Sequence, residues 1–217
     1  LKKVRVIADR IGAILIFDEI TVAWKSNVGG VHLVHGVDPD IVVYAKAMAN
    51  GYPMAAIVGR REVMQTAQDT FVSSTFWTEK IGPVAALTTI KKMKTKNVPV
   101  HLKKIGRMLQ AGWKKLAAKH QFDIKIGEGT EVMPEYTLNY GDQNQAIRTL
   151  LTQEMLKRGF LDMACVYVSY AHKESHIRKY LKAVDEVFAL LVEVIKEGKI
   201  MEKLEGPVAH NRFKRIS

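Results

Sequence analysis

The segment that decides the fold is DPDIVVYAKAMANGYPMAAIVG, residues 38–59. It contains two short apolar runs, 41–45 and 54–59, and a turn signal built from Pro, Gly, Asn or Asp precedes each of them. Unbroken apolar runs of this length are typical of strands that are buried on both faces of a parallel sheet. We therefore expect two neighbouring strands here, with Lys46 directly after the first.

A third apolar run, AILIF at 13–17, lies upstream and is followed by Asp18. The preceding residues, 2–12, are expected to finish a helix, and residues 20–37 are expected to form a loop. Buried strands that alternate with helical segments predict an α/β fold with a mostly parallel sheet. Strands at 13–18 and 41–45 should be parallel in that sheet, with Asp18 and Lys46 at their carboxyl ends.

The chain divides into two expected regions, 1–97 and 98–217. The first holds the buried strands, and a helix at 82–96 joins it to the second. The second reads as a small α+β module whose helices and strands follow the hydrophobic periodicity. Its expected helices are 101–120, 142–158 and 174–197, and its expected strands are 122–127, 135–140 and 165–171.

The chain carries a strong positive charge, with 33 Lys and Arg residues against 22 Asp and Glu residues and a formal net charge of +11. Such a balance favours a polyanion partner. The basic residues nevertheless lie beside acids on helical segments and form no run of five or six like charges, which is typical of solvated helix faces. We therefore expect no nucleic-acid partner, while a basic nucleic-acid-binding domain stays an alternative.

Other global features restrict the class of protein. Hydrophobic residues make up 47% of the 217 positions, enough to bury a sizeable core. No apolar window is long enough for a transmembrane helix, so we expect no membrane partner. Cys165 is the single cysteine, which favours a reducing, cytoplasmic compartment. Because the chain opens on Leu1 inside an expected helix, we expect it to be the later part of a longer protein.

Two ionisable side chains follow the expected parallel strands. Ligands of open α/β sheets bind at the carboxyl ends of the strands, which is where Asp18 and Lys46 are placed. A lysine and a carboxylate that converge there suit pyridoxal phosphate chemistry, in which the amine forms a Schiff base and the acid keeps the pyridine nitrogen protonated. By position alone, a lysine such as Lys46 is far more often a solvated surface charge, and an aspartate such as Asp18 more often caps or closes a turn.

Longer motifs favour the interpretation of Lys46 and Asp18 as cofactor-binding residues. The stretches LIFDEI at 15–20, GVDPDIVVYAKAMANGYPMAAIVGRREVM at 36–64 and SSTFWTEKIGPVAA at 73–86 resemble, in order, the signature of class III (ω-type, subgroup II) aminotransferases. The glutamate-1-semialdehyde aminomutase-like branch is the most similar. The stretches VYVSYAH, KYLKAVDEVFALL and EGPVAHNRFKR, which begin at 166, 179 and 205, resemble the small domain of that branch.

The resemblance implies a fold and a set of roles. The region 1–97 would be part of the large domain of a fold type I pyridoxal-phosphate-dependent transferase, and 98–217 its small C-terminal domain. Lys46 would be the Schiff-base lysine and proton shuttle, and Asp18 the partner of the pyridine nitrogen. Ile20 would pack on one face of the ring, and Gly51 and Pro53 would shape the turn behind the lysine.

A hydroxyl is also implied at the cofactor phosphate of a neighbouring subunit, so the resemblance implies a homodimer. Thr75 matches that position, although the residues inserted before Gly82 leave Ser74 and Thr78 as alternatives. The substrates would be an amino donor and a carbonyl acceptor. Aminotransferase and aminomutase activities stay open, because both use the same lysine and aspartate.

This sequence also departs from the family pattern. Trp24-Lys25 stands where a Phe-Arg pair is usual, which replaces a forked guanidinium by a point charge and puts a carboxylate-binding role there in doubt. The phosphate-binding turn and the aromatic residue that stacks on the ring belong to an N-terminal half that this chain lacks. An inert truncated half, or an assembly partner, is therefore an alternative to an active enzyme.

Three further candidates carry weaker signals. His32 and His35 form an H-x-x-H pair, but no nearby Cys or carboxylate completes a metal-ligand set, so no metal is expected. His172 follows an expected strand and could face substrate. Cys165 opens the same strand and is expected to be a buried, inert thiol.

Overall fold

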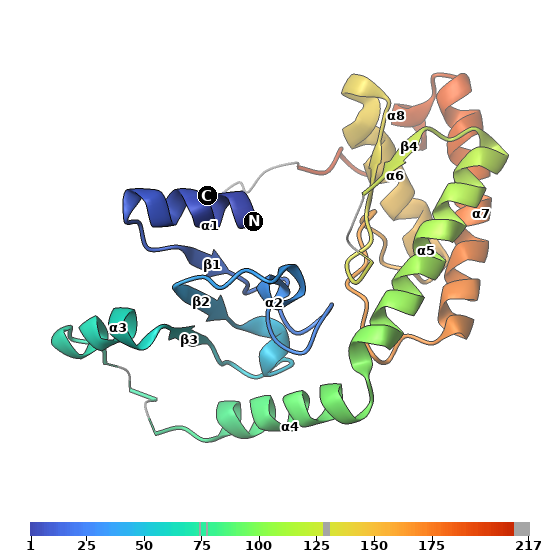
Figure 1. Ribbon diagram of the computed structural model, residues 1–217. Coiled ribbons are helices and arrows are strands. Elements are labelled where there is room, and N and C mark those ends of the chain that lie inside the picture. The colour runs from blue at the N-terminus through green and yellow to red at the C-terminus, as the bar shows by residue number, and fades with distance from the viewer. Residues whose placement is uncertain (74, 77, 128–130, 211–217) are drawn as a thin grey trace. The chain divides into compact units, whose positions relative to one another are not determined.

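The chain forms two compact units, Leu1–His101 and Leu102–Ser217, in the computed structural model (Figure 1). The structure describes residues 1–73, 75–76, 78–127 and 131–210. The roles predicted for regions 1–97 and 98–217, as parts of a cofactor-binding domain and a small domain, stay predictions.

A three-stranded sheet organises the first unit, in the order β1 (Ile16–Asp18), β2 (Ile41–Tyr44) and β3 (Ala56–Gly59) (Figure 1). The first two strands are parallel, with Asp18 opposite Val43, as the sequence predicts. The third strand pairs with β2 in the antiparallel direction. The predicted α/β class is confirmed, and the sheet is mixed rather than parallel throughout.

The prediction that these strands are buried on both faces is wrong for the described part of the chain. Ile16 in β1 is 54% exposed and Ile57 in β3 is 60% exposed. The two strands form the edges of the sheet, and the described residues leave these side chains uncovered. The apolar runs therefore show that these strand faces are suited to burial. Actual burial also needs another element that covers them.

Short helices complete the first unit. They are α1 (Lys2–Ile11), α2 (Val31–His35), the 3₁₀ turns η1 (Lys46–Met48) and η2 (Gln65–Asp69), α3 (Arg61–Met64) and α4 (Ile81–Thr95). The sequence predicts α1 and α4 as helical segments. The helix α2 lies within the expected loop 20–37 and spans only five residues. Its short length gives no helical periodicity to detect.

A buried carboxylate, that of Asp40, joins three separate segments of the first unit. Its Oδ2 atom accepts hydrogen bonds from the Leu15 backbone N–H at 2.7 Å and from Arg5 Nη1 at 2.8 Å. Arg60 Nη1 lies 3.2 Å from Oδ1. The Leu15 hydrogen bond and the Arg5 guanidinium lower the pKa of Asp40. This side chain therefore holds α1, the start of β1 and the end of β3 against the start of β2.

Three long helices and a short hairpin form the second unit. The helices are α5 (Val98–His120), α6 (Asn144–Lys157) and α7 (Glu174–Lys196), with the shorter η3 (Gly141–Gln143) and α8 (Ile200–Lys203). The strands β4 (Ile124–Ile126) and β5 (Tyr136–Leu138) pair antiparallel. Aromatic rings fill the core, where Trp113, Tyr136 and Phe188 are fully buried and Tyr136 packs edge-on against each of the other two.

The predicted third strand of this unit, 165–171, is wrong. Only Cys165 forms a bridge, to Glu135. Val166 and Val168 donate backbone hydrogen bonds to the carbonyls of Pro134 and Val132. Pro134 has no N–H to return a bond, so a regular ladder does not extend through this position.

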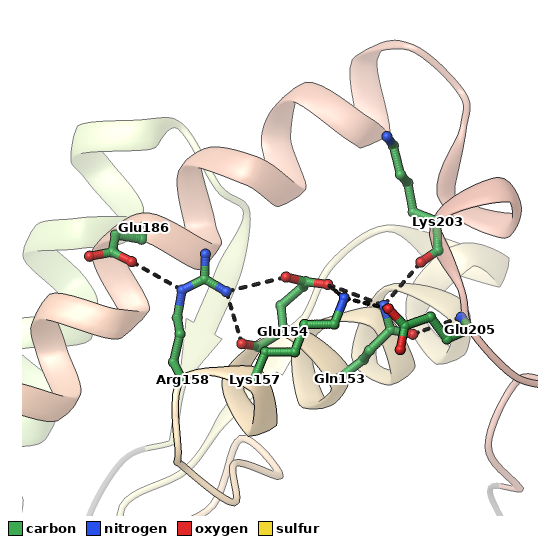
Figure 2. A network of polar contacts seen from close by, with 7 residues as sticks. All are labelled: Gln153, Glu154, Lys157, Arg158, Glu186, Lys203 and Glu205. Atoms are coloured by element: carbon green, nitrogen blue, oxygen red, sulfur yellow. Dashed lines mark hydrogen bonds and ion pairs between the residues drawn. The ribbon is translucent and has the colours of Figure 1, made fainter.

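A polar network ties α6 to α7 and to the segment after α8 (Figure 2). Arg158 donates from Nε to Glu186 on α7 at 3.0 Å and pairs through Nη1 with Glu154 at 3.2 Å. Lys157 pairs with both Glu154 and Glu205 at 2.7 Å. These contacts lower the pKa of Glu154 against the opposing effect of its burial. The network thus fixes the C-terminal segment to α6.

Candidate active site

The predicted site residues Asp18 and Lys46 lie at the same edge of the sheet. Asp18 is the last residue of β1, and Lys46 begins the turn η1 that follows β2. Since β1 and β2 are parallel and Asp18 lies opposite Val43, both side chains leave the carboxyl ends of adjacent strands. Both are exposed.

The Lys46 amine is held by a residue that the sequence analysis did not identify. Its Nζ atom donates a hydrogen bond to Thr21 Oγ1 at 2.7 Å. Thr21 is half-buried and comes three residues after Asp18. The hydrogen bond therefore links the end of β1 to the end of β2 through side chains. No spacing rule could reveal it, because it depends on how the loop after β1 turns back over the strand ends.

The backbone at Lys46 is in a rarely occupied conformation. Lys46 has φ +47°, in the left-handed region, and Asn50 in the same turn has φ +49°. For residues other than glycine this conformation costs about 1–2 kcal/mol. Gly51, at φ +103°, completes the reversal at no such cost. Strained residues of this kind persist where the surroundings impose them, and they cluster at functional sites.

Asp18 makes a local turn as well as facing the edge of the sheet. Its Oδ1 atom accepts the backbone N–H of Ile20 at 3.0 Å. The next backbone N–H, that of Glu19, continues the ladder by donating to the Val43 carbonyl at 3.0 Å. The turn interpretation of Asp18 is thus confirmed, and the hydrogen bond fixes the carboxylate relative to the strand end, while its role at the pyridine nitrogen stays a prediction. Ile20 is half-buried beside it.

A buried carboxylate, Glu19, fixes the loop that carries Thr21. Glu19 Oε1 accepts the backbone N–H of His32 at 2.9 Å and lies 2.7 Å from His32 Nδ1. Glu19 Oε2 accepts the backbone N–H of Val31. A Cβ atom on Gly30 would clash with the His32 ring and lie 2.8 Å from Glu19 Oε2. Glycine is therefore required at this close approach, and the loop 20–30 is clamped at both ends.

The sequence analysis considered His32 only as half of a weak metal motif. Its ring instead contacts Glu19, and both side chains are buried. Over the described ranges, no group of three or more His, Cys, Asp or Glu residues is arranged to hold a metal ion. The signal that could have revealed the pair is a second ionisable residue, Glu19, directly after Asp18 at the end of the strand.

A small core and an open cavity lie around the lysine turn. Met48 and Ala49 of the turn are buried together with Ala86, so α4 packs against the turn. Trp24 and Tyr44 pack against this cluster and meet edge to face. The cavity has a volume of about 520 Å³. Its lining consists of Lys46, Ala47, Asn50, Gly51, Tyr52, Pro53 and Met54.

The hydroxyl predicted to reach the cofactor phosphate could come from any of three residues. Thr75 and Thr78 are exposed, and Ser74 lies outside the described residues. The predicted role concerns a neighbouring subunit, so Thr75 is not expected to meet Lys46 of its own chain. The nearby Glu79 accepts the backbone N–H groups of Ile81 and Gly82 and thereby begins α4.

His172 and the basic residues of α5 have structural contacts. The His172 Nδ1 atom accepts the backbone N–H of Ser169 at 3.0 Å and so closes a turn. Several basic residues of α5 pair with acids: Lys104 with Glu174, Arg107 with Glu131 and Lys119 with Asp185.

Within the described part of the chain, no helix is sufficiently long and apolar to span a membrane.

Comparisons with known proteins place these features in a family. The family model for class-III aminotransferases matches residues 1–192. The 3-aminobutyryl-CoA aminotransferase of Cloacimonas acidaminovorans is 30% identical over 87% of this chain and 47% of that protein. The glutamate-1-semialdehyde 2,1-aminomutase of Clostridium kluyveri is 28% identical over 85% of this chain and 48% of that protein. The chain spans about half the length of these curated relatives.

Solved structures agree on the fold. The internal aldimine form of FumI from Sphingopyxis sp. MTA144 superimposes with a TM-score of 0.83 at 24% identity, covering 90% of this chain and 47% of that one. A pyridoxal-phosphate-bound transaminase superimposes with a TM-score of 0.81 at 20% identity. These similarities confirm the fold that the sequence motifs imply. Because the family model matches nearly the whole chain, the protein belongs to the class-III aminotransferase family.

Proposed function

We propose that this chain carries the reactive lysine of a pyridoxal-phosphate-dependent enzyme that transfers an amino group between an amino donor and a carbonyl acceptor. The observation that carries the proposal is the placement of Lys46. Its amine is held 2.7 Å from Thr21 at the sheet edge where Asp18 ends β1. The names of the relatives, an aminotransferase and an aminomutase, support this class of reaction.

The residues present suit the aldehyde and ring ends of the cofactor. Lys46 is exposed and lines an open surface cavity of about 520 Å³, whose lining does not include Asp18 or Ile20. Asp18 offers a carboxylate that is fixed by its bond to the Ile20 N–H. When bound, pyridoxal phosphate supplies an aldehyde for the lysine and a ring that accepts electron density.

Each residue of the chain then has a defined task. Lys46 would hold the aldehyde carbon before substrate binds and, as the free amine once substrate has taken its place, would move a proton at the amino-bearing carbon of the substrate. Asp18 holds the proton on the ring nitrogen, and Ile20 packs on one ring face. Thr75 reaches the phosphate in a neighbouring subunit, with Ser74 and Thr78 as alternatives. The working assembly in this proposal is a cytoplasmic homodimer.

The chain covers about half the length of its curated relatives, and this affects the activity expected of the 217-residue chain alone. We propose that the 217-residue chain binds the cofactor weakly and does not turn over, because a phosphate that lacks part of its donors loses charge-assisted hydrogen bonds. The same coverage favours a second candidate, a non-catalytic assembly partner. Aminotransferase and aminomutase activities would use the same lysine and aspartate, so the proposal stands at the level of amino-group transfer.

Absorption spectroscopy tests the proposal against that second candidate. The chain is mixed with pyridoxal phosphate, and the band of the lysine-bound cofactor is titrated. We expect a band that Lys46→Ala abolishes and that Asp18→Asn retains with a changed pH dependence, since only the lysine forms the covalent link. Identical bands from wild type and Lys46→Ala would contradict the proposal and leave the assembly partner.

A further inference from the structure

We propose that Thr21 is a positioning residue for Lys46. Its hydroxyl holds the lysine amine at the carboxyl ends of β1 and β2, so that the amine meets an incoming aldehyde from one direction. The inference rests on the proposed function, since it concerns the same lysine. It goes further by naming a residue whose contact is the 2.7 Å hydrogen bond between Thr21 Oγ1 and Lys46 Nζ.

The position of Thr21 is itself well fixed. Glu19, two residues earlier, is buried and clamps the loop through His32 and Val31. The backbone N–H of Ala23, two residues later, donates to the Glu19 carbonyl at 3.0 Å. Thr21 is β-branched and half-buried, and branching at Cβ restricts its χ1 angle. The hydroxyl thus presents a defined direction to the lysine.

Lys46 needs such a partner because the rest of the side chain is free to move. It is exposed, and a lysine on a flexible four-carbon stem has many rotamers of similar energy. Its backbone conformation, at φ +47°, does not by itself fix the amine. The hydroxyl oxygen can accept a hydrogen bond from an N–H of the charged or the neutral amine, which leaves the lone pair of the neutral amine free to attack the aldehyde. Thr21 can therefore hold Nζ in both protonation states.

The test measures the rate at which the Lys46 amine reacts with pyridoxal phosphate in the 217-residue chain. The amine condenses with the aldehyde and releases water, and borohydride then delivers hydride to the C=N bond to leave a stable secondary amine. Peptide mapping gives the extent of labelling at Lys46 against time. Lys91, an exposed lysine on α4, is the internal reference in the same molecule. The rates are compared at a pH high enough that both amines are neutral.

We compare Thr21→Val, which removes the hydroxyl at nearly constant shape, with Thr21→Ser, which keeps it. Loss of one hydrogen bond predicts a rate at Lys46 that is lower by about three- to tenfold in Thr21→Val, with Thr21→Ser within about twofold of wild type. Labelling of Lys91 should not change. If Thr21→Val fails to fold by circular dichroism, Thr21→Ala takes its place with the same expected decrease.

The outcomes separate this inference from the proposed function. Wild-type rates at Lys46 in Thr21→Val, or an equal decrease in Thr21→Ser, would overturn the positioning role while selective labelling of wild-type Lys46 still supports the proposed function. If wild-type Lys46 reacts no faster than Lys91, both the proposed function and the positioning role fail.

Discussion

Glu19 and His32 form a buried pair in which the carboxylate Oε1 atom lies 2.7 Å from the ring Nδ1 atom. The pair joins the end of β1 to the first turn of α2 and encloses the loop that bears Thr21. The geometry of the proposed site therefore depends on a contact that does not itself touch the reacting lysine. That dependence can be measured as stability.

The first prediction concerns this pair. His32→Ala leaves Glu19 without its ring partner in a buried place, so we expect a loss of about 1–3 kcal/mol in the free energy of unfolding. His35, on the same short helix, is exposed. His35→Ala is the matched control and should change stability by less than about 0.5 kcal/mol. Urea titration followed by circular dichroism measures both, and equal effects would contradict the clamp.

The second prediction is a pH dependence at Asp40. The pKa of Asp40 is lowered in the folded state, chiefly by the Leu15 N–H and then by Arg5. A lowered folded pKa contributes stability above the unfolded pKa, which is about 3.9, and this stability is lost as pH falls through the folded value. Asp40→Asn should therefore be less stable than wild type at pH 5–8, with a difference that shrinks below about pH 4.

Denaturant titrations at several pH values measure that difference. Asp38→Asn changes an exposed carboxylate in the same turn and is the control. A difference between wild type and Asp40→Asn that stays constant down to pH 2 would show that the carboxylate charge at Asp40 is not the stabilising feature.

The third prediction contrasts two buried tyrosines of the second unit. The Tyr180 hydroxyl donates to Asp162 Oδ2 at 2.6 Å and accepts from Trp113 Nε1 at 3.0 Å. The Tyr136 hydroxyl is buried and has no hydrogen-bond partner within the described residues. Tyr180→Phe should cost about 1–3 kcal/mol because it leaves two buried polar groups unpaired. Tyr136→Phe removes an unpaired polar group and should be neutral or stabilising.

Thermal and urea unfolding of the two variants decide this prediction. Burial raises the pKa of Asp162, so the loss in Tyr180→Phe should also be smaller at low pH, where the protonated carboxyl is easier to accommodate. A larger loss in Tyr136→Phe than in Tyr180→Phe would refute the assignment of hydrogen bonds.

The fourth prediction concerns the apolar edge of the first unit. Ile57 on the edge strand β3 is 60% exposed, and Phe71 is 97% exposed. Open edges and exposed apolar side chains favour association. We expect concentration-dependent association in sedimentation velocity, weakened by Ile57→Lys. Wild-type chain that stays monomeric across a wide concentration range would argue against this expectation.

The sequence predicts much of this architecture because the relevant signals are local. Apolar runs that end in Asp18 and precede Lys46 identified the parallel strands, and helical periodicity identified α5, α6 and α7. The clamp at Glu19 and the junction at Asp40 were not predicted, because each joins segments 13 to 35 residues apart. Such pairings follow from the folded path of the chain and leave no periodic pattern in the sequence.

At the site, too, the features that follow from local sequence were predicted and the contact that depends on the folded loop was not. Placement of Asp18 and Lys46 at one edge follows from the rule for parallel strands. The contact of Lys46 with Thr21 depends on the conformation of the loop 20–30, which contains Trp24 at φ +60° and Gly29 at φ +115°. The predicted strand at 165–171 was wrong because β-type composition does not show that Pro134 would lie opposite it.

Peptide mapping of the trapped cofactor tests the central claim most directly. The chain is incubated with pyridoxal phosphate, reduced with borohydride and digested, and the labelled lysines are quantified. The account predicts that Lys46 carries the earliest and largest share of the label, and that Lys46→Ala removes this share without raising the label elsewhere. A label that is spread evenly over the exposed lysines, or concentrated on any lysine other than Lys46, would contradict it.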